Sequence, residues 1–85
     1  MPVAIFLTMT VEQALDPLSS DVRLALGRVG QHLKANPQFL MGNEVPGHPE
    51  LREWHFEAAA KTWRVTIDVG RWPSWYVMTL EALPR

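Results

Sequence analysis

Three segments near the end of the chain carry charged and titratable side chains between apolar ones. Glu53 and His55 lie two residues apart in the first segment, and Arg64 stands between two apolar residues in the second. Side chains at every second position of a β-strand share one face, so we expect these polar groups to face outward together. Glu81, in the third segment, is a candidate to join them. A guanidinium can bind a phosphate through two parallel hydrogen bonds, while imidazole and carboxylate groups exchange protons. Together they form a candidate set of a cation, an imidazole and carboxylates that could support acid–base chemistry.

The same side chains also have ordinary structural interpretations. Arg64 could be a solvated arginine on an exposed sheet face, and His55 a surface histidine. The charged residues of the first two segments could form nothing more than cross-strand pairs: Glu53, Glu57, Lys61 and Arg64. Sequence patterns alone leave these interpretations open beside the catalytic one.

The elements that must position this set are three predicted strands. Residues 51–57, 63–69 and 75–83 are rich in β-branched and aromatic residues, and turns are expected at 58–61 and 70–73. The middle segment alternates strictly between apolar and polar residues, which is typical of an antiparallel strand buried on one face. We therefore expect a three-stranded antiparallel meander.

A strand and two helices are expected before the meander. Residues 3–9 favour a strand, and the Thr10–Gln13 spacing predicts a capping box at the start of a short helix over 11–15. The next helix is the strongest pattern in the sequence, with apolar residues at spacings of four, three and four: Val22, Leu26, Val29 and Leu33. The fold class predicted is therefore α+β, in the order β-α-α-β-β-β.

The boundaries of the long helix and its glycines are informative. Asp16, Ser19 or Ser20 could cap its start, and Asn36-Pro37 ends it. Gly27 and Gly30 cost helix propensity, about 1 kcal/mol each relative to alanine. We expect that the two glycines allow a neighbouring element to approach the helix closely.

Two further segments lie outside the predicted helices and strands. Residues 38–49 contain three prolines or glycines in close succession near their end, so we expect a loop without regular structure. The second turn carries Trp72 and Trp75. Either one of them folds over the edge of the sheet, or they form an anchor for a partner protein.

Composition restricts the class of protein. The 85 residues suit one domain, residues 1–85, and 47% of them are hydrophobic. With no cysteine, and no trusted ligand spacing around His32 or His48, we expect no metal and no cofactor.

The short apolar start lacks the features of a signal peptide, and no run approaches the ~20 apolar residues of a membrane span. We expect a cytoplasmic protein with no membrane association. The net charge of -1 argues mildly against tight, unaided binding to nucleic acid.

Several segments, in order, resemble the RelE/ParE superfamily of bacterial toxins, and its HigB-like members in particular. The resemblance rests on the helix junction 15–23, the helix exit 33–37, the Pro-Glu-Leu-Arg segment 49–52, the Thr-Trp-Arg-Val segment 62–65 and the last strand 76–83. It covers nearly the whole chain, although each segment is short. The order of the segments carries more weight than any one of them.

The resemblance implies a toxin of a type II toxin–antitoxin system, neutralised by a cognate antitoxin protein. RelE- and HigB-like members cut messenger RNA on the ribosome, and ParE-like members poison DNA gyrase. Under the first activity Arg64 occupies the family's central arginine position, with Glu53, His55 and Glu81 as catalytic partners. Substrate-binding candidates are then Arg52, Lys61 and Arg85. For Arg52, a structural role bracing the loop is the favoured interpretation.

Two departures from the family pattern keep alternatives open. Active ribonucleases of the family are usually basic and carry further catalytic residues after the last strand, where this sequence offers only Arg85. A weakened endoribonuclease, a ParE-like or catalytically silent binder of a protein target, and a small interaction module unrelated to toxins are the competing hypotheses. A homodimer is also conceivable.

Overall fold

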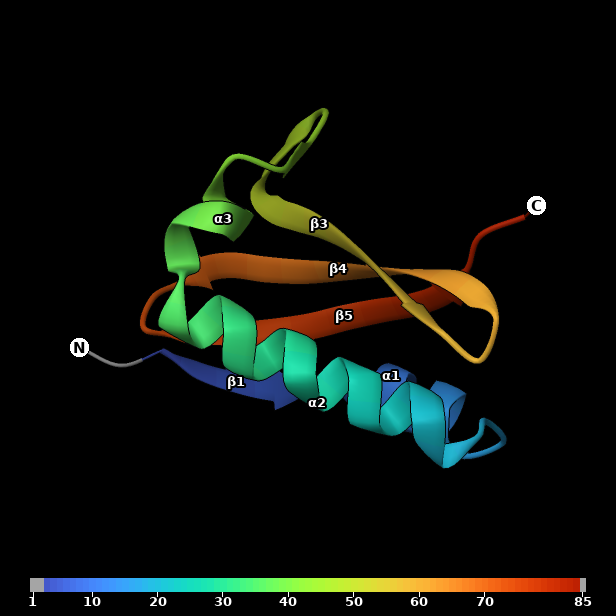
Figure 1. Ribbon diagram of the computed structural model, residues 1–85. Coiled ribbons are helices and arrows are strands. Elements are labelled where there is room, and N and C mark those ends of the chain that lie inside the picture. The colour runs from blue at the N-terminus through green and yellow to red at the C-terminus, as the bar shows by residue number, and fades with distance from the viewer. Residues whose placement is uncertain (1–2, 85) are drawn as a thin grey trace.

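The computed structural model describes residues 3–84, which form a five-stranded sheet crossed on one face by a long helix (Figure 1). The elements follow in the order β1 (Ala4–Leu7), α1 (Met9–Leu15), α2 (Ser20–Ala35), α3 (Pro37–Met41), β2 (Glu44–Val45), β3 (His48–Ala58), β4 (Lys61–Arg71) and β5 (Ser74–Ala82). The α+β class and the antiparallel meander of β3, β4 and β5 are confirmed.

The sheet has the order β1-β5-β4-β3-β2, so the meander is extended at both sides. β1 runs parallel to β5, while all other neighbours are antiparallel. Thr8 fixes the end of β1, because its backbone N–H and its hydroxyl both donate to the carbonyl of Val77. The first strand thus borders the last one, although some 70 residues separate them in the chain.

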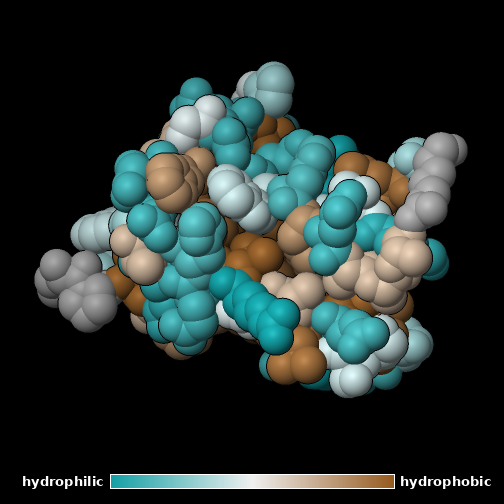
Figure 2. All heavy atoms as spheres, in the orientation of Figure 1, coloured by the Kyte–Doolittle hydropathy of each residue, from teal (hydrophilic) through white to brown (hydrophobic). Residues whose placement is uncertain are grey.

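The core lies between α2 and the sheet. α2 buries the stripe expected from its spacing, with Val22, Leu26 and Leu33 in the core and Val29 packed against it. β4 buries every second residue beneath the helix: Trp63, Val65, Ile67 and Val69. Full burial of such a side chain contributes about 1.5–3 kcal/mol. Figure 2 shows hydrophilic side chains over most of the helix side, with hydrophobic ones visible between them.

A β-bulge in β5 decides which of its side chains face outward. Val65 pairs with Leu80 and Ile67 with Val77, so three steps along β5 match two along β4. Met78 is the extra residue, since no register partner is assigned to it. The bulge keeps Val77 and Leu80 on the core side despite their odd spacing, and it places Glu81 on the opposite face.

The start of α1 differs from the prediction. The N-cap is Thr8 and the helix begins at Met9, so the capping box predicted for Thr10 and Gln13 is wrong. The physical reason is the anchoring of Thr8 on β5, which turns the chain into the helix earlier than the sequence spacing suggests. For α2, Ser19 is the N-cap among the three candidates, and the helix ends before Asn36-Pro37 as predicted.

Residues 38–49 are more ordered than expected. Instead of a plain loop, they contribute α3 and β2, and β3 already begins at His48. Pro37 starts α3, where a missing backbone N–H costs nothing, and Leu40 is fully buried. One buried leucine on a single helical turn is too short a pattern to recognise in the sequence.

The expected close approach at the helix glycines is wrong. A Cβ atom added at Gly27 would meet nothing within 4 Å, and one at Gly30 would meet only the Cδ1 of Ile5 at 3.9 Å. Neither position therefore requires glycine for packing within this chain.

The β3–β4 hairpin closes on a strained pair of residues. Ala59 and Ala60 have φ of 53° and 61°, the left-handed values of a two-residue type I′ turn, which favours Asn-Gly. We predict that Ala60→Gly raises the free energy of unfolding by about 1 kcal/mol, because glycine adopts positive φ without a Cβ penalty. Chemical denaturation measures the change.

Gly47 provides the matched control, since its φ of 81° already requires glycine and a Cβ there would meet nothing within 4 Å. Gly47→Ala should lower the stability by a similar amount. A stability unchanged in both variants would contradict the turn geometry.

Candidate functional site

Three candidate catalytic side chains lie in one row across the meander. His55 on β3 pairs in register with Arg64 on β4, and Arg64 pairs with Glu81 on β5. All three lie on the face of the sheet away from α2, because their neighbours along each strand are turned to the core. The row therefore places a guanidinium between an imidazole and a carboxylate.

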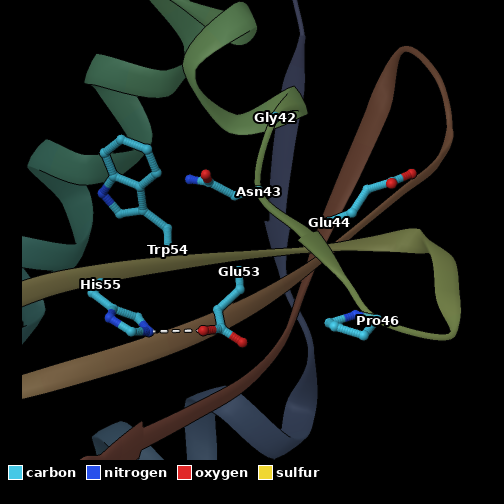
Figure 3. Close-up of a pocket in the computed structure, with 7 residues that line it drawn as sticks. All are labelled: Gly42, Asn43, Glu44, Pro46, Glu53, Trp54 and His55. Carbon is cyan, nitrogen blue, oxygen red and sulfur yellow. Dashed lines mark hydrogen bonds and ion pairs between the residues drawn. The ribbon is translucent and has the colours of Figure 1, made fainter.

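The side chains of this row form two close pairs. Arg64 donates from Nε to Oε1 of Glu81 at 2.9 Å, and its Nη2 donates to the same oxygen. The Nε2 of His55 lies 2.9 Å from Oε1 of Glu53, as Figure 3 shows. The hydrogen bond with Glu81 raises the pKa of Arg64, and the charges of Glu81 and Glu53 act in the same direction. Arg64 is thus a fixed cation, and Glu53 fixes the ring of His55.

A groove runs beside this site at the β3 edge of the sheet. Its volume is about 550 Å³. Its walls come from the residues that follow α3, from β2 and its turn, and from the middle of β3: Gly42, Asn43, Glu44, Pro46, Glu53, Trp54 and His55. Glu53 and His55 point to one side of β3, whereas Trp54 points to the helix side (Figure 3). The groove therefore wraps around the edge of the strand and leaves the Glu53–His55 pair accessible.

The open face of the sheet is acidic. Its strand positions carry four carboxylates: Glu53, Glu57, Asp68 and Glu81. Two guanidiniums oppose them, Arg64 in the centre and Arg71 at the far end, where it lies 5.8 Å from the Tyr76 ring centroid. Phosphate binding gains most of its affinity from cations, so this face has little intrinsic attraction for a polyanion.

Arg52 lies on the helix side of β3, away from the row. It is 8% exposed, and its guanidinium donates to the carbonyls of Met41, Pro49 and Leu51. A carboxylate oxygen of Glu44 lies 3.5 Å from its Nη2. These contacts agree with the loop-bracing interpretation and leave the guanidinium turned away from the open face.

The other predicted binding residues are dispersed. Lys61 stands at the hairpin end of β4, with Nζ 6.0 Å from the Trp63 ring centroid. Arg85 lies outside the described residues. Trp75 is fully buried in the core, so its prediction as a partner anchor is corrected: the alternation of β5 turns it to the core face of the sheet. Trp72 is 56% exposed and contacts the Trp75 ring edge-on at 6.3 Å between centroids.

Two features of the site were missed by sequence reasoning. The carbonyl of Asn43 accepts a hydrogen bond from the backbone of Glu53, and both residues line the groove. Phe6 stacks on Tyr76 on the open face, with centroids 5.5 Å apart. Alternation around Trp75 could have placed Tyr76 there, but no local signal brings Phe6 from β1 to its side.

Comparison with known proteins gives no relative: no family model, no curated protein and no solved structure matches the chain. Within residues 3–84, no helix is long and apolar enough to cross a membrane. The same residues contain no group of three or more His, Asp or Glu side chains placed to hold a metal ion. The class of protein that can be stated is an α+β domain with an acidic, polar sheet face.

The contacts of Arg52 generate a stability prediction. Arg52→Met should lower the free energy of unfolding by about 3 kcal/mol, because three carbonyls lose a charged donor in a buried place. Hydrogen exchange should speed up in residues 41–52, where the bonds are lost. Arg64→Met is the control, and it should cost much less stability, since its ion pair is exposed to solvent. Equal losses would contradict the bracing role.

Proposed function

We propose that this chain is a RelE/ParE-like toxin that cleaves messenger RNA on the ribosome. The observation that carries the proposal is the row of His55, Arg64 and Glu81, with Glu53 bonded to the imidazole. The resemblance in sequence supports the same activity. A cognate antitoxin and a cytoplasmic setting belong to the proposal.

The row suits a transesterification that needs no metal. Glu81 takes the proton of a ribose 2′-hydroxyl as that oxygen attacks the adjacent phosphorus, and Arg64 stabilises the charge on the phosphorane. His55, protonated and held by Glu53, gives its proton to the departing 5′-oxygen. The products are a 2′,3′-cyclic phosphate and a free 5′-hydroxyl, so protons and bonds balance.

The order of the row matches the geometry of the reaction. Attacking and leaving oxygens lie on opposite sides of the phosphorus, so the base and the acid must stand on opposite sides of the phosphate. Strands of a sheet are about 4.8 Å apart, which separates the β3 and β5 backbones by roughly 10 Å with Arg64 between them. Glu81 and His55 can therefore approach one phosphate from its two sides.

The acidic surroundings favour an RNA substrate that the ribosome holds in place over free RNA that the domain must bind by itself. Carboxylates outnumber cations on the open face, so free RNA gains little from ion pairing there. A ribosome that already holds the messenger supplies the proximity that the domain lacks. A slightly acidic chain is then compatible with this activity, because the ribosome and not the domain holds the RNA.

A second candidate is a toxin-like or catalytically silent domain that binds a protein target such as DNA gyrase. The exposed ring of Trp72 favours it, because aromatic side chains often anchor protein interfaces. This candidate requires no RNA cleavage.

The decisive experiment is cleavage of messenger RNA in a translating extract, mapped by primer extension. Arg64→Ala should reduce the rate by at least ~10²-fold, because the phosphorane loses its cation. Arg71→Ala is the matched control on the same face, and its rate should stay within about twofold. Thermal melting of both variants shows whether they remain folded. Growth arrest that survives Arg64→Ala, without any cleavage, would favour the protein-binding candidate.

Substitutions at the two ends of the row test the roles of base and acid. Glu81→Gln and His55→Asn should each reduce the cleavage rate by about 10²–10⁴-fold, because a carboxamide can neither accept the proton of the 2′-hydroxyl nor protonate the departing oxygen. Unchanged cleavage rates in both variants would rule out these assignments.

A further inference from the structure

β3 has a free edge along its second half. β2 has only two residues and pairs with β3 at Arg52 and His48. The N–H of Glu53 points away from β4, because it donates to the carbonyl of Asn43. Backbone groups of an antiparallel strand alternate in direction, so those of His55 and Glu57 point the same way. Within residues 3–84 no hydrogen bond is made to the outward backbone groups of His55 and Glu57.

The side chains beside this edge differ between its two faces. On the open face stand the carboxylates of Glu53 and Glu57. On the helix side Trp54 lies half-buried, and His32 links it to Phe39, with ring centroids 6.2 Å and 5.5 Å apart. Phe39 remains 49% exposed. One face of the edge is therefore acidic and the other is aromatic.

We propose that the edge of β3 from Glu53 to Glu57 binds an extended segment of a partner protein in which basic and apolar residues alternate. The segment adds as a further strand, and the outward groups of His55 and Glu57 form its backbone hydrogen bonds. Its basic side chains then meet the carboxylates of Glu53 and Glu57, while its apolar ones lie towards Trp54 and Phe39. The groove of about 550 Å³ beside Glu53 and His55 gives one end of the segment room to enter.

Charge argues against a second copy of the chain as the occupant. Antiparallel pairing of two β3 edges centred on His55 would set Glu53 of one copy opposite Glu57 of the other, and like charges in cross-strand pairs are destabilising. The other outer strand, β1, has the sequence Ala-Ile-Phe-Leu and offers no cation to these carboxylates. A basic segment is the better complement. This inference does not rest on the proposed function, because it uses no catalytic role of any residue.

A designed peptide tests the proposal on the full chain. The probe has about nine residues, a usual strand length, in which lysine alternates with valine. The amides of His55 and Glu57 should exchange freely in the protein alone and at least ~10-fold more slowly with peptide, measured by nuclear magnetic resonance. A peptide of alternating glutamate and valine should give no protection.

Variants locate the site without touching the core. Glu57→Pro removes an N–H that points to solvent and spares the ladder to β4, so it should weaken the peptide at least ~10-fold. Glu57→Gln keeps the backbone donor, and should weaken binding less and reduce its salt dependence. Glu50→Gln is the matched control, since Glu50 precedes the free stretch, and it should leave affinity unchanged.

Each other outcome overturns the proposal. Protection of β1 amides instead of His55 and Glu57 would place the peptide elsewhere. Equal binding of the glutamate peptide would remove the charge argument. Protection of the edge amides without peptide, rising with protein concentration, would make a second copy the occupant. Absence of any protection at millimolar lysine–valine peptide would exclude strand addition.

Discussion

The burial of one face of β4 beneath α2 is the interaction on which the remaining structure depends. Trp63, Val65 and Ile67 enter the core together with Leu26 and Leu33 of the helix. Because successive side chains of a strand alternate, the same burial forces Arg64, Thr66 and Asp68 onto the open face. The polar face is thus a consequence of the core, and a register slip by one residue would exchange the two.

The neighbouring strands satisfy this constraint by different means. β3 alternates without interruption, so His55 meets Arg64 directly. β5 must bury Val77 and Leu80, which an uninterrupted strand would turn to opposite faces, and the bulge at Met78 resolves the conflict. Packing of an apolar residue is therefore what brings Glu81 to Arg64. The ion pair and the hydrophobic core are set by the same register.

Local patterns predicted most of the fold and the central part of the candidate site. The stripe of α2, the two-residue period of β4 and the turn residues are short-range signals, and they were sufficient for the helix, the meander and the outward position of Arg64. The parallel pairing of β1 with β5 depends on the distant contact of Thr8 with Val77, which no local pattern encodes. The loop-bracing role favoured for Arg52 agrees with its contacts, but an arginine on a strand does not reveal which three carbonyls surround it.

The carboxylate of Glu53 belongs to both surfaces of the molecule that are proposed to act. It accepts the hydrogen bond that orients His55, and it lies on the free edge where a basic segment is proposed to add. A lysine placed against Glu53 would compete with the imidazole for the same oxygen. Binding at the edge and the contact that orients His55 would then be coupled, and the coupling free energy must be equal in both directions. An occupied edge would therefore act on the proposed row without covering Arg64, through one shared carboxylate.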